Sequence, residues 1–154
     1  MHRTVELIRE SFDFYYVGVF LVDSRGENAV LQSGTGEAGE RMLAAGYRLP
    51  LNGASMVSWA IARGIPRIAW DVGQDEVHFS NPYLPETRSE MALPLISRGR
   101  CIGAITIQGV AVDAFTEEDF PGVRIILDPD LPHGSEVHPG LRDLHPVDEI
   151  WLLQ

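Results

Sequence analysis

The segment covering residues 89–108 constrains the fold of this chain more than any other. It reads as two apolar strands, Ser89–Ile96 and Cys101–Gln108, with the polar residues between them centred on Arg98-Gly99. A short polar link containing glycine, between runs of β-forming residues, is typical of a β-hairpin. The sequence therefore predicts an antiparallel hairpin here.

The turn decides which side chains share a face of the hairpin. A two-residue turn at Arg98-Gly99 predicts three cross-strand pairs on one face: Met91 with Thr106, Leu93 with Ala104, and Leu95 with Ile102. None of these pairs carries a charge, and the residues assigned to the other face are also uncharged. Both faces of the hairpin are therefore expected to be covered, and the hairpin is expected to lie in the middle of a sheet. Pro94 cannot donate a backbone hydrogen bond, which predicts a bulge or an unpaired stretch there.

Composition narrows the class of protein. A chain of 154 residues is long enough for one domain with a single core, and no apolar run reaches the roughly 20 residues that span a bilayer. No secretory signal is visible, so we expect a cytoplasmic protein. The net charge is -10 and the chain has no lysine, which disfavours binding to nucleic acid or to anionic membranes.

The rest of the chain alternates strand and helix patterns. Strands are expected at Tyr15–Asp23, Ala29–Ser33, Arg48–Leu51 and Arg67–Val72, and helices at Thr4–Phe12 and Ser55–Arg63, with a turn or two of helix around Glu40–Ala45. Gly64 and Pro66 mark the end of the second helix. Residues 73–88 read as a long loop.

Three blocks of this chain carry a resemblance to a known family: residues 14–23 (FYYVGVFLVD), 63–72 (RGIPRIAWDV) and 81–109 (NPYLPETRSEMALPLISRGRCIGAITIQG). Over about residues 5–120 the chain resembles the GAF domains found ahead of bacterial histidine kinases and response-regulator outputs. The resemblance implies an α+β, PAS-related fold with a central antiparallel sheet flanked by helices on both faces and a small-molecule pocket on one. It also implies a noncatalytic sensory module of a bacterial two-component system, with a histidine kinase or other signalling output domain as partner. A homodimer is compatible with it.

Residues 121–154 depart from the family pattern. A capping box at Thr116–Asp119 predicts a helix, but Pro121-Gly122 would break it within a turn. We therefore expect a domain over residues 1–120 and an atypical Pro- and His-rich tail in place of the usual long C-terminal helix. Two explanations stay open: a truncated or frame-shifted product, or a genuine variant whose apolar segments Val123–Leu127 and Ile150–Leu153 cover the same face of the sheet.

The predicted pocket lies on the hairpin face that bears Met91 and Thr106. The 73–88 loop should fold over its polar end, and Arg88 could pair with an anionic ligand. The predicted ligand-binding residues are Trp70, Phe79, Tyr83, Arg88, Ser89, Met91 and Thr106. The competing interpretation is that the aromatic residues fill the core. The sequence identifies neither the ligand nor any cofactor.

Two other binding motifs find less support. The segment Gly34–Gly39 fits the G-x-G-x-x-G dinucleotide pattern, but the strands before it read as a hairpin and no crossover helix follows, so we expect a flexible loop. His133, His138 and His145 match no familiar metal-binding spacing, so no metal site is predicted.

Cys101, the single cysteine, raises the question of an enzyme, because a GAF-type enzyme reduces free methionine sulfoxide. That chemistry needs a resolving thiol, and one cysteine also rules out an internal disulfide or a cysteine-based zinc cluster within one chain. The 73–88 loop has no cysteine for a bilin, and the chain has no lysine for the cyclic-nucleotide signature. The alternatives to a noncatalytic sensor are a dimerisation or scaffold module with a closed pocket, and a thiol-dependent reductase.

Overall fold

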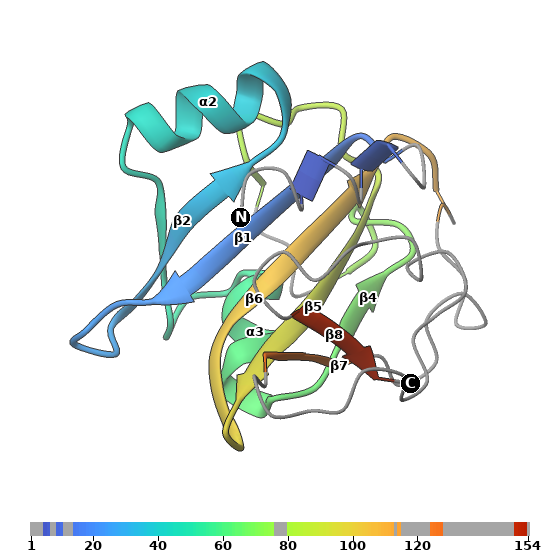
Figure 1. Ribbon diagram of the computed structural model, residues 1–154. Helices are drawn as coiled ribbons and strands as arrows, with labels where there is room; N and C mark the ends of the chain where they lie inside the picture. Colours follow the sequence, from blue (N-terminus) through green and yellow to red (C-terminus); the bar gives the residue numbers. More distant parts are fainter. Residues whose placement is uncertain are drawn as a thin grey trace.

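The computed structural model describes residues 5, 6, 9, 10, 14–75, 80–112 and 114, together with the backbone of 124–127 and 150–153. Strands from both ends of this part of the chain form one curled sheet, with two helices packed on it (Figure 1). The strands are β1 Tyr16–Val22, β2 Asn28–Gly34, β3 Arg48–Pro50, β4 Arg67–Ala69, β5 Ser89–Ser97, β6 Arg100–Gly109, β7 Arg124–Leu127 and β8 Ile150–Leu153. The strands expected from the sequence are confirmed, although β4 ends earlier than predicted.

The β5–β6 hairpin lies at the centre of the sheet, as the sequence predicts. Its order is β3-β2-β1-β6-β5-β7-β8, with β4 also paired to β5. Neighbouring strands are antiparallel except β5 and β7, which run parallel. Since β6 has β1 on one side and β5 on the other, the backbone groups along both of its edges are paired.

The register of this hairpin differs from the predicted one. Arg98 and Gly99 both have positive φ, 49° and 75°, as a two-residue hairpin turn requires. However, the register shifts between Leu95 and Ile96, so that Ala92, and not Met91, lies opposite Thr106. The three predicted pairs are therefore wrong. A bulge adds one residue to one strand, and because side chains alternate, that residue moves every later side chain to the other face.

Pro94 lies beside the irregularity, at a gap in the pairing of β5. It lies one residue before the register shift and opposite Ala104 of β6. On its other side, β4 pairs with residues 90–92 and β7 pairs with residues 95 and 96, so Pro94 falls in the gap between these two partners. A residue without an N–H is best placed where no partner strand needs it.

Two helices have bounds within the described part of the chain, α2 Gly36–Ala44 and α3 Met56–Arg63, and the described residues 5, 6, 9 and 10 are also helical. The hydroxyl of Ser55 caps α3 by accepting a hydrogen bond from the N–H of Ser58 at 3.0 Å. Gly64 ends α3 with φ 63°, which confirms the predicted C-cap.

The glycine-rich segment before and within α2 is a packed junction, and the prediction of a flexible loop is wrong. Gly34 ends β2 and α2 begins two residues later. A Cβ atom on Gly39 would lie 2.3 Å from the carbonyl carbon of Gly34, so only glycine lets the helix approach the strand this closely. Periodicity missed the first turn of α2 because glycines occupy it.

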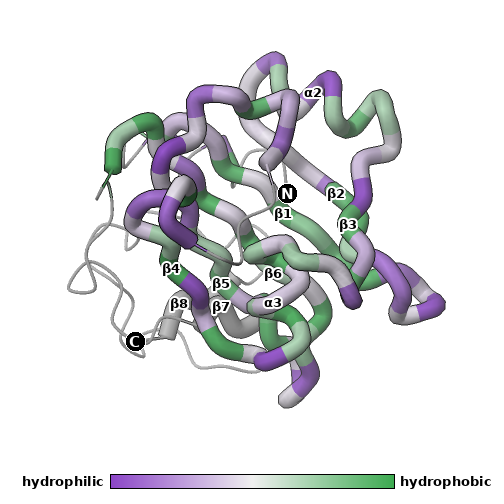
Figure 2. The backbone as a smooth tube through the Cα atoms, turned by 180° about the vertical axis from the view of Figure 1, so that it is seen from behind, coloured by the Kyte–Doolittle hydropathy of each residue, from purple (hydrophilic) through white to green (hydrophobic). Residues whose placement is uncertain are grey.

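The two faces of the sheet bury different sets of side chains. One face holds a wholly apolar cluster: Val5, Val17, Val19, Met91, Leu93, Leu95, Ile105 and Ile107. The other packs against α2 and α3 through Tyr16, Phe20, Ala29, Leu31, Met42, Leu49, Val57, Ile61, Leu84 and Ala104. Figure 2 shows apolar positions along the central strands and α3, and hydrophilic ones at the outer turns. We call these the packed face and the cavity face.

The described part of the tail extends the sheet. The backbone of β7 pairs with β5 at Leu95 and Ile96, and β8 pairs with β7. These strands therefore continue the sheet at its edge, and the expectation that they cover a face is not met for the described backbone. The predicted capping box and the three tail histidines lie outside the described residues. No helix in the described part of the chain is long and apolar enough to cross a membrane.

Candidate functional site

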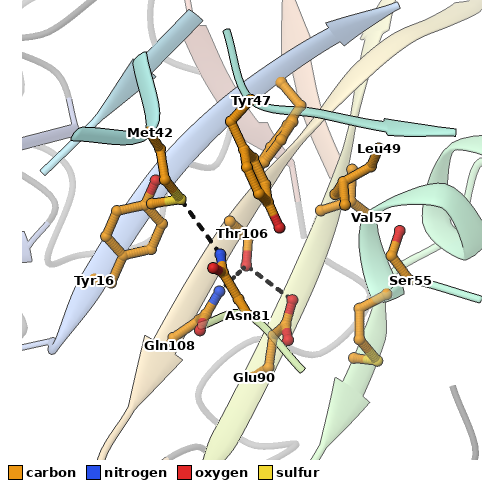
Figure 3. A pocket seen from close by; sticks show the side chains of 12 residues that line it. Tyr16, Met42, Tyr47, Leu49, Ser55, Val57, Asn81, Glu90, Thr106 and Gln108 are labelled. Atoms are coloured by element: carbon orange, nitrogen blue, oxygen red, sulfur yellow. Dashed lines mark hydrogen bonds between the residues drawn. The ribbon is translucent and has the colours of Figure 1, made fainter. Parts of the chain in front are cut away.

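A small cavity lies on the cavity face, between the central strands and the elements that cover them (Figure 3). The volume open to the centre of a water molecule is about 20 Å³, which is room for about one water. The whole space between the walls, including the part open to solvent, is about 360 Å³. Its lining residues are Tyr16, Phe20, Met42, Tyr47, Leu49, Ser55, Met56, Val57, Asn81, Glu90, Thr106 and Gln108.

A chain of hydrogen bonds runs along one wall of the cavity. The Thr87 hydroxyl donates to Gln108 Oε1 at 2.6 Å, and Gln108 Nε2 donates to Thr106 Oγ1 at 3.3 Å. Thr106 Oγ1 in turn donates to Glu90 Oε1 at 3.1 Å. All four side chains are buried. Because every bond points the same way, the chain ends on the carboxylate and fixes the orientation of each group before it.

The strand register places these groups together. Glu90 lies opposite Gln108, and Ala92 lies opposite Thr106, so the three polar side chains share one face of the hairpin. On the other side of β6, Tyr16 pairs with Gln108 and Gly18 with Thr106. Successive side chains of a strand alternate between faces, which leaves the intervening apolar residues on the packed face.

Aromatic side chains also line the cavity. The ring of Tyr47 meets those of Phe20 and Tyr83 edge to face, with centroids 6.2 Å and 6.0 Å apart. Figure 3 shows Tyr47 reaching into the cavity from the segment before β3. Burial raises the pKa of the Tyr47 hydroxyl, and the negative charge of Glu90 raises it further. Tyr47 therefore stays neutral at physiological pH.

Tyr16 adds a second buried phenol. Its hydroxyl has no hydrogen-bond partner among the described residues, and burial raises its pKa well above the usual value. The ring lies over two glycines, because a Cβ atom on Gly18 or Gly34 would come within 2.7 Å or 2.5 Å of the hydroxyl oxygen. The glycines of β1 and β2 thus make the space that this side chain occupies.

The loop before β5 closes over the cavity through its described residues 80–88. Asn81 Nδ2 donates to the Met42 sulfur at 3.3 Å, and Asn81 Oδ1 accepts from the N–H of Tyr83 at 2.9 Å. The backbone N–H of Arg88 donates to the carbonyl of Gly109 at 2.8 Å, which ties the end of the loop to β6. The loop therefore brings Asn81 to the cavity wall.

Of the predicted ligand-binding residues, Thr106 lines the cavity. Tyr83 packs beside it, against the ring of Tyr47, and the guanidinium of Arg41 lies 5.6 Å from the centre of its ring. Arg88 is exposed and is absent from the lining, so the structure does not bring its charge to the cavity.

The other predicted residues lie elsewhere. Met91 is fully buried in the packed face, and Trp70 packs against the same cluster. Ser89 shares the face of Met91 because it is two residues away on the same strand, and its buried hydroxyl has no hydrogen-bond partner within the part of the chain that the structure describes. Phe79 lies outside the described residues. Ligand binding by this set of residues stays a prediction.

Sequence reasoning missed Glu90, Tyr47 and Asn81 as members of the site. Glu90 offered a signal, since it is a charged residue within a strand expected to be buried on both sides. A buried carboxylate rarely occurs without partners, and its presence marks a polar site. Tyr47 and Asn81 lie in loops, where no periodicity shows which way a side chain points.

Cys101 lies near the hairpin turn, away from the cavity lining. Five residues along β6 separate it from Thr106, a distance of roughly 17 Å at the rise of an extended strand. Its Sγ donates to the carbonyl of Gly103 at 3.4 Å, and burial raises the pKa of the thiol. A thiol with a raised pKa is a poor nucleophile at neutral pH.

Metal ligands do not gather in the described residues, where no three His, Cys, Asp or Glu side chains come together. The cavity instead offers a carboxylate, two side-chain amides, hydroxyls and aromatic rings. Such a set can hold a small polar molecule by hydrogen bonds and ring contacts.

A curled, mostly antiparallel sheet with helices packed on it defines an α+β domain. The chain belongs to the GAF domain family, because the family model described as "GAF domain" matches residues 1–128. No curated protein matches the chain.

Solved structures share this fold. A free methionine-R-sulfoxide reductase from Neisseria meningitidis, solved with its substrate, is 30% identical with a TM-score of 0.64, over 77% of this chain and 65% of that one. The type II enzyme from Thermoplasma acidophilum is 22% identical with a TM-score of 0.66, over 77% and 78%. The GAF domain of an Acinetobacter phosphoenolpyruvate-protein phosphotransferase is 16% identical with a TM-score of 0.63, over 76% and 68%. The chain thus spans just under two thirds of the Neisseria protein.

Proposed function

We propose that this protein is a noncatalytic regulatory module that binds a small molecule in the cavity beneath the 80–88 loop. The observation that carries the proposal is the oriented chain of hydrogen bonds that ends at Glu90 on the cavity wall. Buried polar groups cost stability unless they are paired, and a packed apolar face would serve a purely structural domain better.

Binding would act by selecting among conformers. Asn81 and Tyr83 connect the cavity to the loop, and the end of that loop is tied to β6, which is the centre of the sheet. A ligand that contacts the loop and the sheet favours the conformer in which both are in place. This shift would pass to a signalling partner such as a histidine kinase or another output domain, in the cytoplasm of a bacterial cell.

The alternative is that the protein is an enzyme, a thiol-dependent reductase. The structural similarity to free methionine-R-sulfoxide reductases supports testing this alternative. The position of Cys101 near the hairpin turn and its raised pKa favour binding over thiol chemistry. The scaffold alternative corresponds to a cavity that holds only water. An experiment that detects a ligand in the cavity distinguishes the proposed binding module from the reductase and from the scaffold.

The test combines native mass spectrometry with thermal unfolding. The protein, purified from cells under mild conditions, is expected to carry a small molecule whose addition raises the Tm of the stripped protein. Val57→Phe fills the cavity from α3 and should abolish both effects, whereas Ala62→Phe, on the exposed side of the same helix, should keep them. If native protein carries nothing and no compound in a metabolite library raises the Tm, the scaffold interpretation holds instead.

A further inference from the structure

The sign of the charge in the cavity identifies a class of ligand. Among the described residues that line it, Glu90 is the one acid, and none is Arg, Lys or His. Burial raises the pKa of both tyrosine hydroxyls, so these groups add no charge at physiological pH. The side chains that line the cavity thus carry one negative charge and no positive one.

The enclosed part of the cavity also limits the size of the group it can take. With about 20 Å³ open to the centre of a water molecule, it accepts a group of about one heavy atom. A primary ammonium group has this size and donates three hydrogen bonds. The cavity offers acceptors in the Glu90 carboxylate and the amide oxygen of Asn81, and the wider space toward solvent can hold the remainder of a ligand.

The aromatic wall favours the same chemistry. The rings of Phe20 and Tyr47 line the same cavity as the polar side chains, Phe20 from β1 and Tyr47 from the segment before β3. Faces of aromatic rings attract cations, and the attraction grows when water is excluded. A carboxylate beside aromatic rings is therefore suited to a protonated amine and opposes a phosphate or carboxylate.

We infer that the cavity binds a small molecule through a primary ammonium group held at Glu90. This inference rests on the proposed function and adds the chemical class of the ligand. It replaces the expectation of an anionic ligand paired with Arg88, whose side chain is exposed and outside the lining.

The test uses three four-carbon probes of similar size: n-butylamine, 1-butanol and butyrate. Each is titrated into the ¹⁵N-labelled full chain at neutral pH while backbone amide shifts of β5 and β6 are followed. The amine is expected to bind at least about tenfold more tightly than the alcohol, since its hydrogen bond to the Glu90 carboxylate joins two opposite charges whereas that of the alcohol brings no charge of its own. Butyrate should bind most weakly of the three.

Two variants locate the effect. Glu90→Gln keeps the shape of the side chain and removes its charge, so it should reduce the preference for the amine over the alcohol to below about threefold. Glu86→Gln makes the same change of net charge at an exposed position of the loop and should leave the preference intact. Should Glu90→Gln fail to fold, the order of the three probes on the native chain decides alone.

Equal binding of amine and alcohol, or no shifts with the amine at millimolar concentrations, would overturn the ammonium inference. The proposed function fails on a different result, the absence of any copurifying or stabilising small molecule. If a copurifying ligand is found and it is an anion, the module binds a ligand as proposed and the inference about its charge is wrong.

Discussion

The two faces of the β5–β6 hairpin are formed by the same twenty residues, but they differ in the side chains that they bury. The packed face buries Met91, Leu93 and Ile105 in an apolar cluster. The cavity face, offset by one residue on each strand, buries Glu90 and Thr106 beside room for about one water. The difference teaches that alternation along two strands can combine stability on one side with recognition on the other.

Leu93→Ala on the packed face should have the largest effect. Leu93 is 2% exposed within an apolar cluster, so truncation leaves a void and should lower the free energy of unfolding by about 2–5 kcal/mol. Urea denaturation measures the loss. A loss under about 1 kcal/mol would mean that this face is loosely packed, contrary to the comparison.

A matched pair of Val and Thr exchanges should separate the faces. Val19→Thr puts a hydroxyl without a partner into the packed face and should cost about 1–3 kcal/mol. Thr106→Val removes the hydroxyl between Glu90 and Gln108 and should cost only about 1 kcal/mol, because a water in the cavity can take over its hydrogen bonds. Equal costs, measured by urea denaturation, would remove the distinction between a dry face and a hydrated one.

Alkaline pH should act on the cavity face. The folded-state pKa of Tyr47 is raised above 10, so the unfolded chain loses the phenolic proton first and stability falls as pH rises above 10. The fall should reach up to about 1.4 kcal/mol per pH unit for each such tyrosine, Tyr16 included. Tyr47→Phe should make the fall shallower. Urea midpoints at pH 9 and pH 11 test this, and identical slopes for the variant and the parent would contradict it.

Cys101→Ser should have the smallest effect. The thiol is half-buried near the hairpin turn, away from the cavity, so the substitution should change stability by less than about 1 kcal/mol and leave ligand binding unchanged. Turnover of free methionine sulfoxide is expected in neither form. Turnover by the parent that the substitution abolishes would establish the reductase function and contradict the proposal.

The sequence predicts the framework of the fold because its signals are local. Gly64 ends α3 and Gly99 lies in the turn of the hairpin, since each of these two positions has a positive φ that a side chain disfavours. The register of the hairpin is not predictable in this way, because the shift after Leu95 depends on how β5 meets both β4 and β7. Pro94 indicates an irregularity without saying at which bond it falls.

The site is less predictable than the fold because it follows from that register. With the shift, Thr106 joins Glu90 and leaves the face of Met91, so one extra residue divides the predicted set of ligand-binding residues between two faces. Tyr47 and Asn81 reach the cavity from loops, and only tertiary packing determines their direction. Glu90 could have been found from its charge in an apolar strand.

The most direct test of the two-faced hairpin is an NMR measurement of nuclear Overhauser effects on the selectively methyl-labelled chain. The account predicts contacts between the methyl group of Thr106 and the side chain of Glu90, and between the methyl group of Met91 and the apolar cluster around Ile105. A strong contact between the methyl groups of Thr106 and Met91 would place both on one face and contradict the account.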